Sequence, residues 1–369
     1  MSSAGQDGKS PTVHVVAKEL RHGRGARSNK AGRFEQDRVE AFDDGWDSLS
    51  LLDAFKTEVF EDKARSIISR NDSPDISFES SINPYRGCEH GCIYCYARPT
   101  HCYLGHSAGL DFETKLYAKS DAAALLRKEF AKPSYKPAMI ALGGNTDPYQ
   151  PIERQRRITR AILEVMAETN HPVGIITKSA LIVRDIDVLG PMARKGLVRV
   201  AVSITTLDRA VARAMEPRAA TPERRLDTVR RLSDAGIPVA VMVAPIIPGL
   251  TDHEIEPILK AARQAGARDA GYVLLRLPLE IKDLFREWLW EEFPERAARI
   301  ISLLQSMHGG RDYTPDFGIR QRGTGPYASQ IATRFKLAKK RLGLEEERWG
   351  PSTDLFNRPS DRGQQLKLL

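Results

Sequence analysis

Cysteine is scarce in this chain, and every residue of this type lies within one short stretch. The 369 residues contain Cys88, Cys92, Cys95 and Cys102, and no cysteine follows position 102. A chain of this length can bury a core without covalent cross-links, and we find no secretory leader in it. These features argue against a disulfide-stabilised secreted protein and predict reduced thiols in a cytoplasmic one.

Long apolar runs are missing as well. The longest, Gly236 to Leu250, is too short to span a bilayer and contains three prolines, Pro238, Pro245 and Pro248. The sequence therefore predicts no transmembrane helix, and no membrane partner is expected. A hydrophobic content of 41% is enough for one large core of barrel size with extensions at both ends.

Acidic residues are absent from the segment Phe317 to Leu344, which includes Tyr327, Phe335 and a Gly-Thr-Gly-Pro turn. Its basic residues are Arg320, Arg322, Arg334, Lys336, Lys339, Lys340 and Arg341. Basic charge interleaved with aromatic rings is typical of phosphate contact and base stacking, and equally of a solvated helix face. Together with a net charge of +8, this segment makes DNA or RNA a candidate partner.

The cysteine-bearing stretch runs from Asn83 to Tyr103 and reads NPYRGCEHGCIYCYARPTHCY. Three of its cysteines have the spacing C-x3-C-x2-C, so one loop can wrap three thiolates around a metal centre, and its glycines allow tight bends. An iron–sulfur cube wants four ligands, so a group of three indicates that one iron keeps an open position. A zinc site is the alternative, with a fourth ligand taken from His90, His101, Cys102 or His106.

Short apolar segments alternate with helix-like segments from Ile76 onward. The predicted strands are Ile76–Ile82, Ala138–Leu142, Val173–Thr177, Val198–Ile204, Val239–Ala244 and Gly271–Leu275, and Phe112–Tyr117 is expected to be extended. The predicted helices are Asp121–Phe130, Arg156–Thr169, Arg184–Lys195, Pro222–Ala235 and Asp252–Gln264. Because buried parallel strands read as short apolar runs, this order predicts an α/β fold, a partial (β/α)6 TIM-like barrel, with a doubly wound sheet as the alternative.

The remaining parts of the chain are expected to flank this barrel. We expect a flexible basic arm over residues 1–50, a linker or helical lead-in over 51–75, the barrel over 76–280, a helical and basic extension over 281–344, and a tail over 345–369. Within the extension, Ile281–Phe293 and Ala297–Met307 are predicted helices.

Polar residues follow four successive predicted strands, where the functional residues of such barrels lie. After the second strand, Gly143 and Gly144 allow a ligand to approach the backbone closely, and Thr146 and Asp147 offer hydrogen bonds. Further candidates are Lys178 after the third strand, Ser203, Thr205 and Thr206 after the fourth, and Ala244, Pro245 and Gly249 after the fifth. This arrangement predicts a ligand site at one end of the barrel.

The cysteine loop, with Tyr94 just before its third cysteine, resembles the radical S-adenosylmethionine (SAM) superfamily. Tyr96, just after that cysteine, narrows the resemblance to spore photoproduct lyase and the related "DNA repair photolyase" proteins. The resemblance covers about residues 76–280. It implies a [4Fe–4S] cluster on Cys88, Cys92 and Cys95, whose open iron chelates SAM before reductive cleavage to methionine and a 5′-deoxyadenosyl radical.

The resemblance also implies roles for individual residues. Thr146 stands where the family has a serine that contacts SAM, Lys178 matches a lysine for its carboxylate, and Ser203 matches a second contacting serine. Glu216 with Pro217, and Arg225 with Leu226, match an acidic-proline turn and an Arg-Leu pair near the ribose. The expected cofactor-binding set is completed by Tyr94, Gly143 and Gly144, and the candidate catalytic residues are Tyr96 and Cys102.

One position departs from the lyase pattern. Where that family has a thiol hydrogen-atom donor, two residues before the SAM-contacting hydroxyl, this chain has Gly144. The favoured interpretation is a cytoplasmic radical SAM enzyme that acts on nucleic acid, as in lyase-like DNA repair. Flavodoxin or ferredoxin is the expected electron donor. If the target is a base in duplex DNA, this base would have to leave the base stack to reach the cluster. The alternatives are a radical SAM enzyme acting on a peptide, an RNA or a small molecule, and a zinc-dependent nucleic-acid-binding protein without catalysis.

Overall fold

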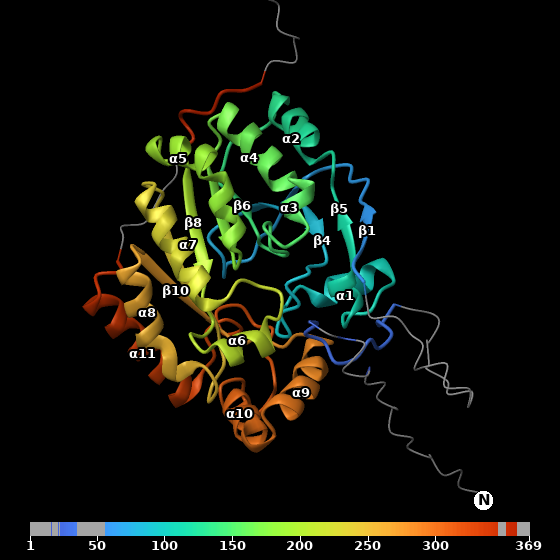
Figure 1. The fold of residues 1–369 in the computed structure, drawn as a ribbon, viewed down its shortest axis with the longest axis vertical. Helices are drawn as coiled ribbons and strands as arrows, with labels where there is room; N and C mark the ends of the chain where they lie inside the picture. Colours follow the sequence, from blue (N-terminus) through green and yellow to red (C-terminus); the bar gives the residue numbers. More distant parts are fainter. Residues whose placement is uncertain (1–15, 17–20, 22, 35–55, 346–351, 360–369) are drawn as a thin grey trace, which may run out of the picture.

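The computed structural model describes residues 16, 21, 23–34, 56–345 and 352–359. Its central element is a sheet of seven strands (Figure 1). In chain order these strands are β2 (Ile68–Arg70), β3 (Ser80–Ile82), β6 (Ile140–Leu142), β7 (Val173–Thr177), β8 (Val198–Ser203), β9 (Val239–Ile246) and β10 (Asp269–Leu274). Their spatial order is β10-β9-β8-β7-β6-β3-β2, and all neighbours are parallel except β2 and β3.

The sheet is a partial barrel. Its strands follow one another in the order of the sequence, without the reversal that defines a doubly wound sheet. Within the described residues no ladder joins the edge strand β10 to the edge strand β2, so the barrel stays open along one side. The predicted α/β class and partial barrel are therefore confirmed.

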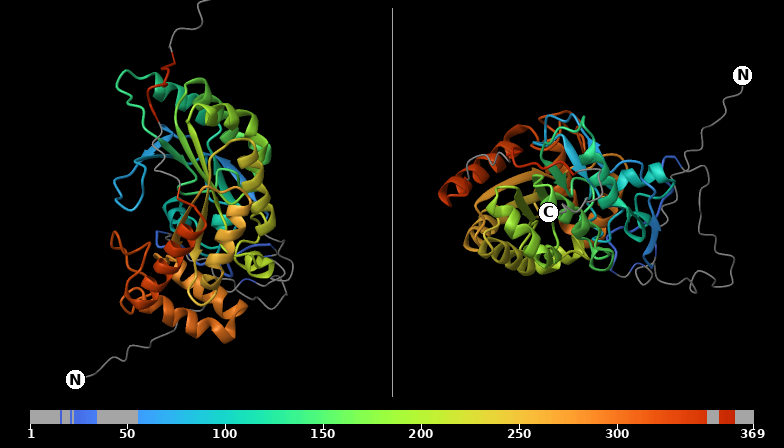
Figure 2. Two further views of the ribbon diagram at one scale, coloured as in Figure 1. Left: turned by 90° about the vertical axis from the view of Figure 1, so that its left-hand side faces the viewer. Right: turned by 90° about the horizontal axis from the view of Figure 1, so that it is seen from above.

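Helices cover one side of the curved sheet (Figure 2). Those that follow its strands are α2 (Ala122–Ala131), α3 (Glu153–Arg156), α4 (Ile158–Glu168), α5 (Ile186–Arg194), α6 (Arg209–Met215), α7 (Pro222–Asp234) and α8 (Ile255–Gln264), with short 3-10 turns at Ala180–Asp185 and Asp252–Glu254. Helix α2 contacts α4, α4 contacts α5, and α7 contacts α8, which makes a continuous outer layer. Thr221 caps α7 by accepting a hydrogen bond from the Arg224 amide, next to Pro222 at the first helical position.

Two stretches that precede β6 differ from their predicted structure. Residues 58–70 contain the strands β1 (Glu58–Glu61) and β2 in place of a helical lead-in, because β1 pairs with the distant strand β5 (Lys115–Ala118). The expected extended segment Phe112–Tyr117 begins instead with the short helix α1 (Asp111–Thr114). A third strand, β4 (Tyr85–Arg86), completes this small sheet in the order β1-β5-β4.

The N-terminal segment of residues 23–34 packs against the body of the protein, between α1 and helix α9 (Ile281–Glu292) (Figure 1). The amides of Gly25 and Ala26 donate to the Glu113 carboxylate at 2.9 and 2.8 Å. Arg27 pairs with Glu292, and Arg21, just before the segment, pairs with Glu291. A flexible arm was expected here, and its described part is instead held by buried polar contacts; the other residues of 1–50 lie outside the described residues.

The C-terminal extension contains the helices α9, α10 (Pro294–Ser306) and α11 (Gly325–Arg341); in Figure 1, α9 and α10 lie below α6, and α11 lies beside α8. Helix α11 contacts α8, and its Phe335 ring lies 4.6 Å from the Tyr272 ring of β10. The basic residues are partly neutralised within the protein: Lys339 pairs with Asp269 at 2.6 Å, and Arg334 pairs with a carboxylate of α8. From residues 352–359, the Asn357 amide donates to the Thr169 carbonyl at 2.8 Å.

The expected role of this extension in base stacking is wrong for its two aromatic residues. Phe335 is 5% exposed, and Tyr327 is half-buried against the core with its hydroxyl donating to Asp252 at 2.6 Å, so neither ring stands free in solvent as a stacking platform. The cause is the apolar stripe of α11, which seats both rings against the barrel. Lys336, Lys340 and Arg341 remain exposed on the outer face.

Hydrogen bonds connect the β2–β3 loop to the segment around Arg320 across the open side of the barrel. Asp75, in the loop between β2 and β3, accepts hydrogen bonds from the Gly318 amide at 2.6 Å and from Arg320. Arg320 also donates to Ser73 at 2.6 Å, and its guanidinium lies 4.4 Å from the Phe317 ring. The segment that carries Arg320 is itself attached to β10, where the Leu274 amide donates to the Gln321 carbonyl. Within the described ranges, no helix has the length and apolar character needed to cross a bilayer.

Candidate active site

The loop that follows β3 carries the three clustered cysteines at the carboxyl end of the barrel strands. Gly87 and Gly91 have φ angles of +76° and +66°, a conformation that favours glycine. A Cβ at Gly91 would also lie 2.7 Å from the Glu113 carboxylate, and one at Gly87 would lie 2.9 Å from the Phe112 carbonyl. The two predicted bends are therefore required both by the backbone and by close neighbours.

Arg98 clamps this loop from within. It donates to the carbonyls of Gly91 and Cys92 at 3.1 and 2.9 Å, and to two further carbonyls of residues 108 and 109. Its remaining donor pairs with Glu113 at 2.6 Å, and both side chains are completely buried. Glu113 also receives the amides of residues 25 and 26, so the N-terminal segment and the cysteine loop share one anchor.

All four cysteines are free thiols. Cys88 and Cys92 are buried and Cys95 is half-buried. Burial raises the pKa of all three thiols. The negative charges of Asp147 and Glu216 raise the pKa values of Cys88 and Cys92 further, and the positive charge of Lys178 opposes part of the rise at Cys92 and Cys95. Thiolates gathered beside a cation are the donor set of a metal centre.

The donor set fits an iron–sulfur cube. Among the described residues, no three His, Cys, Asp or Glu side chains converge closely enough to chelate a single ion. A cube binds each cysteine through a different iron, so three thiols from one loop can serve it without converging on one point.

The candidate fourth ligands of a zinc site are engaged elsewhere. His101 and His106 bond to the Lys115 carbonyl at 2.8 Å and the Tyr117 hydroxyl at 2.7 Å, while His90 faces Asp147 at 3.4 Å. Cys102 is completely buried, and a Cβ at Gly32 would lie 2.9 Å from its sulfur. Its thiol, a candidate catalytic group from sequence, is therefore covered by the N-terminal segment.

Tyr94 belongs to a buried network of hydrogen bonds next to the cysteine loop. Its hydroxyl donates to Glu216, which also receives the Thr205 hydroxyl at 2.7 Å and an ion pair from Arg225. The other Arg225 donors go to the carbonyls of Ser203 at 3.1 Å and of Ala220 at 2.7 Å. Tyr94, Glu216 and Arg225, predicted together as cofactor-binding residues, are thus brought together, with Arg225 fully committed to protein acceptors.

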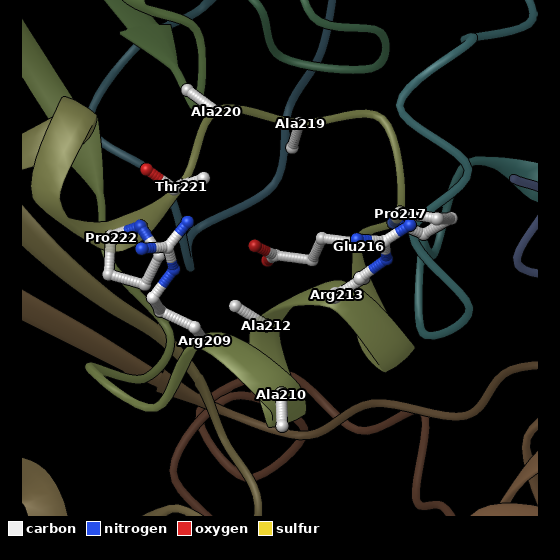
Figure 3. Close-up of a pocket in the computed structure, with 10 residues that line it drawn as sticks. All are labelled: Arg209, Ala210, Ala212, Arg213, Glu216, Pro217, Ala219, Ala220, Thr221 and Pro222. Atoms are coloured by element: carbon white, nitrogen blue, oxygen red, sulfur yellow. The ribbon is translucent and has the colours of Figure 1, made fainter.

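Glu216 also borders a cavity of about 320 Å³ beside α6. Figure 3 shows its carboxylate directed toward the middle of this cavity, between α6 and the segment that holds Ala219 and Thr221. Arg209 and Arg213 of α6 line the same space. The carboxylate therefore stands between the cysteine loop and a cavity large enough for part of a small ligand.

The residues after β6 brace the loop against β7. Gly143 has a φ of +89°, and a Cβ there would lie 2.2 Å from the Ile176 carbonyl. The Thr146 hydroxyl donates to the Tyr85 carbonyl at 3.0 Å, so this predicted SAM contact is already bonded inside the protein. Asp147 accepts from Thr177 and from the Lys178 amide, each at 2.7 Å. Burial alone would raise the pKa of Asp147, but His90 and these donors lower it to about 2.

Lys178 and Ser203 lie at the carboxyl ends of β7 and β8, as predicted. The Lys178 ammonium is 5.7 Å from the centre of the Tyr94 ring, and in the described part of the chain it has no hydrogen-bond or ion-pair partner. Ser203 is 3% exposed. A free ammonium near the thiols of Cys92 and Cys95 is suited to bind a carboxylate.

Tyr96 crosses the mouth of the barrel. Its hydroxyl donates to the Gly144 carbonyl after β6, and Arg276, two residues past the end of β10, lies over its ring at 5.0 Å. Arg276 was not among the predicted site residues. The sequence does contain an indication of this residue, because Arg276 is a single charged residue between Leu275 and Leu277, just after the last strand. Its position is equivalent to that of Lys178 after β7.

Known proteins share this domain. Residues 82–262 match the family model described as "Radical SAM superfamily". An uncharacterized protein of Mycobacterium tuberculosis is 37% identical over 226 residues, which cover 61% of this chain and 66% of that protein, just under two thirds of its length. An uncharacterized protein of Acidianus two-tailed virus is 30% identical over 222 residues, which cover 58% of this chain and 72% of that protein.

A solved structure has the same fold. That of spore photoproduct lyase complexed with dinucleoside spore photoproduct superposes with a TM-score of 0.54 over 77% of this chain and 79% of that chain. The two sequences are 18% identical, so the likeness concerns the fold alone.

Proposed function

Because this chain belongs to the radical SAM superfamily, whose members use a [4Fe–4S] cluster and SAM, we propose that Cys88, Cys92 and Cys95 hold this cluster and that the enzyme cleaves SAM reductively. One observation carries the proposal: a single loop at the carboxyl end of a parallel barrel holds three free thiols, and two of them, those of Cys92 and Cys95, feel the charge of the unpaired Lys178 ammonium. We propose that it works in the cytoplasm with a reduced flavodoxin or ferredoxin as electron donor.

When bound, the cluster supplies the electron that splits SAM and so yields a 5′-deoxyadenosyl radical; the protein supplies position and shielding. Lys178 binds the SAM carboxylate, and Gly143 and Gly144 let the ligand approach the backbone after β6. Ser203 offers a hydroxyl after β8. Glu216 and Arg225 hold Tyr94 against the loop, so the ring keeps one face of the site closed to water.

Removing the Lys178 ammonium is expected to weaken SAM binding by about 1.5–3 kcal/mol, the size of a charge-assisted hydrogen bond. The measurement is a SAM titration of anaerobically reconstituted wild type and Lys178→Ala. The matched control is Lys128→Ala, which removes an exposed ammonium of α2. Normal iron content with wild-type affinity in Lys178→Ala would remove this residue from the SAM site.

Nucleic acid is the proposed substrate class, in a reaction related to lyase-like DNA repair. An exposed aromatic pair supports it: Phe34 and Tyr103 are 54% and 70% exposed with ring centres 5.1 Å apart, and the Arg33 guanidinium lies 4.8 and 5.2 Å from them. Rings with a cation form the stacking platforms of single-strand binders. The lyase of the same fold is complexed with a dinucleoside, which points in the same direction. Peptides, RNA and small molecules remain the other substrate classes.

Replacing Tyr103 by alanine is expected to cost about 1–3 kcal/mol in binding of a single-stranded oligonucleotide, because an exposed ring that stacks on a base is lost. Tyr327→Ala serves as the matched control, since the Tyr327 hydroxyl is bonded to Asp252 within the protein. Fluorescence anisotropy at several salt concentrations measures both variants. In a second assay, a panel of oligonucleotides, peptides and small molecules is screened for compounds that increase the release of 5′-deoxyadenosine by the wild type. Absence of salt-dependent oligonucleotide binding by the wild type would exclude nucleic acid as the substrate.

A further inference from the structure

Arg276 occupies the mouth of the barrel with its donors unused. In the described part of the chain, none of its nitrogens forms a hydrogen bond or an ion pair, and its Nε is buried without a partner. The carboxylate of Asp75 is already bonded to the Gly318 amide and to Arg320, which lower its pKa, and the charge of Arg276 contributes to this lowering. A buried N–H group without an acceptor is costly, so such groups are nearly always satisfied.

The ring beneath Arg276 fixes the direction of these donors. The guanidinium carbon lies 5.0 Å from the centre of the Tyr96 ring, which is anchored to the Gly144 carbonyl on the opposite side of the mouth. A guanidinium held over a ring still has N–H groups to donate, and two of them can bond two oxygens of an anion. Tyr96 directly follows Cys95, so an anion held there lies beside the proposed cluster.

Charge and exposure indicate which anion fits. Tyr96 is 45% exposed, so its ring has surface left for a further partner. An arginine next to an accessible ring is the combination that holds a backbone phosphate together with a stacked base. The SAM carboxylate is assigned to Lys178, which lies beside Tyr94 after β7, whereas Arg276 follows β10.

We propose that Arg276 binds a phosphate of a nucleic-acid substrate and thereby places the adjacent nucleotide over Tyr96, at the cluster. This inference rests on the nucleic-acid substrate proposed above and assigns a binding residue to it. Arg276 follows the edge strand β10, next to the side of the barrel where no ladder joins the two edges of the sheet.

The test compares binding of a fluorescent single-stranded oligonucleotide and of a glutamate-rich peptide of equal charge to the reconstituted wild type, to Arg276→Gln and to Arg231→Gln. Arg231 is the matched control, because it is an exposed arginine of the outer helix α7 and lies outside the basic segment Phe317–Leu344. Iron content and melting temperature establish that each variant is folded. Salt concentration is varied in every titration.

Arg276→Gln should weaken oligonucleotide binding by about 10- to 100-fold, as the loss of a charge-assisted pair does. It should also reduce the slope of log K against log salt by about 0.7, the value for one contact to a single strand. Arg231→Gln should change affinity less than about twofold, within the range of an exposed charge.

Three results overturn the inference. Equal losses in both variants would mean that only general charge matters. Unchanged oligonucleotide affinity in Arg276→Gln, with clear binding by the wild type, would reject the role of Arg276 and leave the nucleic-acid proposal standing. Binding of the acidic peptide alone, with its loss in Arg276→Gln, would identify the anion as a carboxylate and reject the nucleic-acid assignment too.

Discussion

Replacing any one of Cys88, Cys92 and Cys95 by alanine is expected to abolish iron binding and SAM cleavage together. The three thiols are the cysteine donors of one loop, and a cube left with two protein ligands is not retained. The measurement is iron and sulfide content after anaerobic reconstitution, with 5′-deoxyadenosine release under reduction as the second readout. The wild type should bind about four irons.

Cys102→Ala is the control for these variants. This thiol is completely buried under the N-terminal segment, so its removal should leave iron content and SAM cleavage as in the wild type. Loss of iron in Cys102→Ala would show a fourth cysteine ligand and so a closed iron, which contradicts SAM binding at the cluster. Retention of four irons by an alanine variant of the loop cysteines would reject the assignment of that cysteine.

Removing the Glu113 side chain is expected to lower the free energy of unfolding by about 3–5 kcal/mol, because the charge of Arg98 is then left buried without its partner. Both side chains are completely buried, and the pair is 2.6 Å apart. Two amides of the N-terminal segment lose their acceptor as well. Denaturant unfolding of Glu113→Ala in the absence of iron measures the loss separately from cluster binding.

A surface pair provides the matched control. Arg127 and Glu168 are 2.8 Å apart, but both are about half exposed, so Glu168→Ala should cost less than about 1 kcal/mol. The double variant Arg98→Met/Glu113→Leu should recover part of the loss, since no buried charge remains in it. A loss in Glu113→Ala as small as that in Glu168→Ala would show that the Arg98 charge is satisfied by carbonyls alone.

The strands of the barrel could be predicted because each is a short apolar run between polar turns. The observed β7 has the predicted limits Val173–Thr177, and β8 and β10 differ from prediction by only one or two residues at each end. Such runs keep their structure regardless of details elsewhere, since both faces of a parallel strand are buried. Residues 58–70 were not predictable in this way, because β1 depends on pairing with β5 rather than on its own pattern.

The candidate site likewise contains some residues that can be recognised in the sequence and others that cannot. The cysteine spacing lies within one loop and is visible in the sequence, as are Lys178 and Ser203 at strand ends. Arg276 could not be identified from spacing, since its role depends on which ring the fold brings beneath it. The rings of Tyr327 and Phe335 were misinterpreted for the opposite reason: the sequence shows an aromatic residue between basic ones but not the face of the helix that packs inward.

The shared anchor at Glu113 bears on how far the chain can be shortened. The family model begins at residue 82 and ends at residue 262, so a fragment trimmed to those limits omits β10, Arg276 and the segment around Gly25. It would keep Glu113 and Arg98 but remove the two amides that complete their site, and it would uncover Cys102 to solvent and oxidant. We therefore expect shortened versions for crystallisation or labelling to be more stable, and less prone to oxidation at Cys102, when they keep residues 23–34 together with β10.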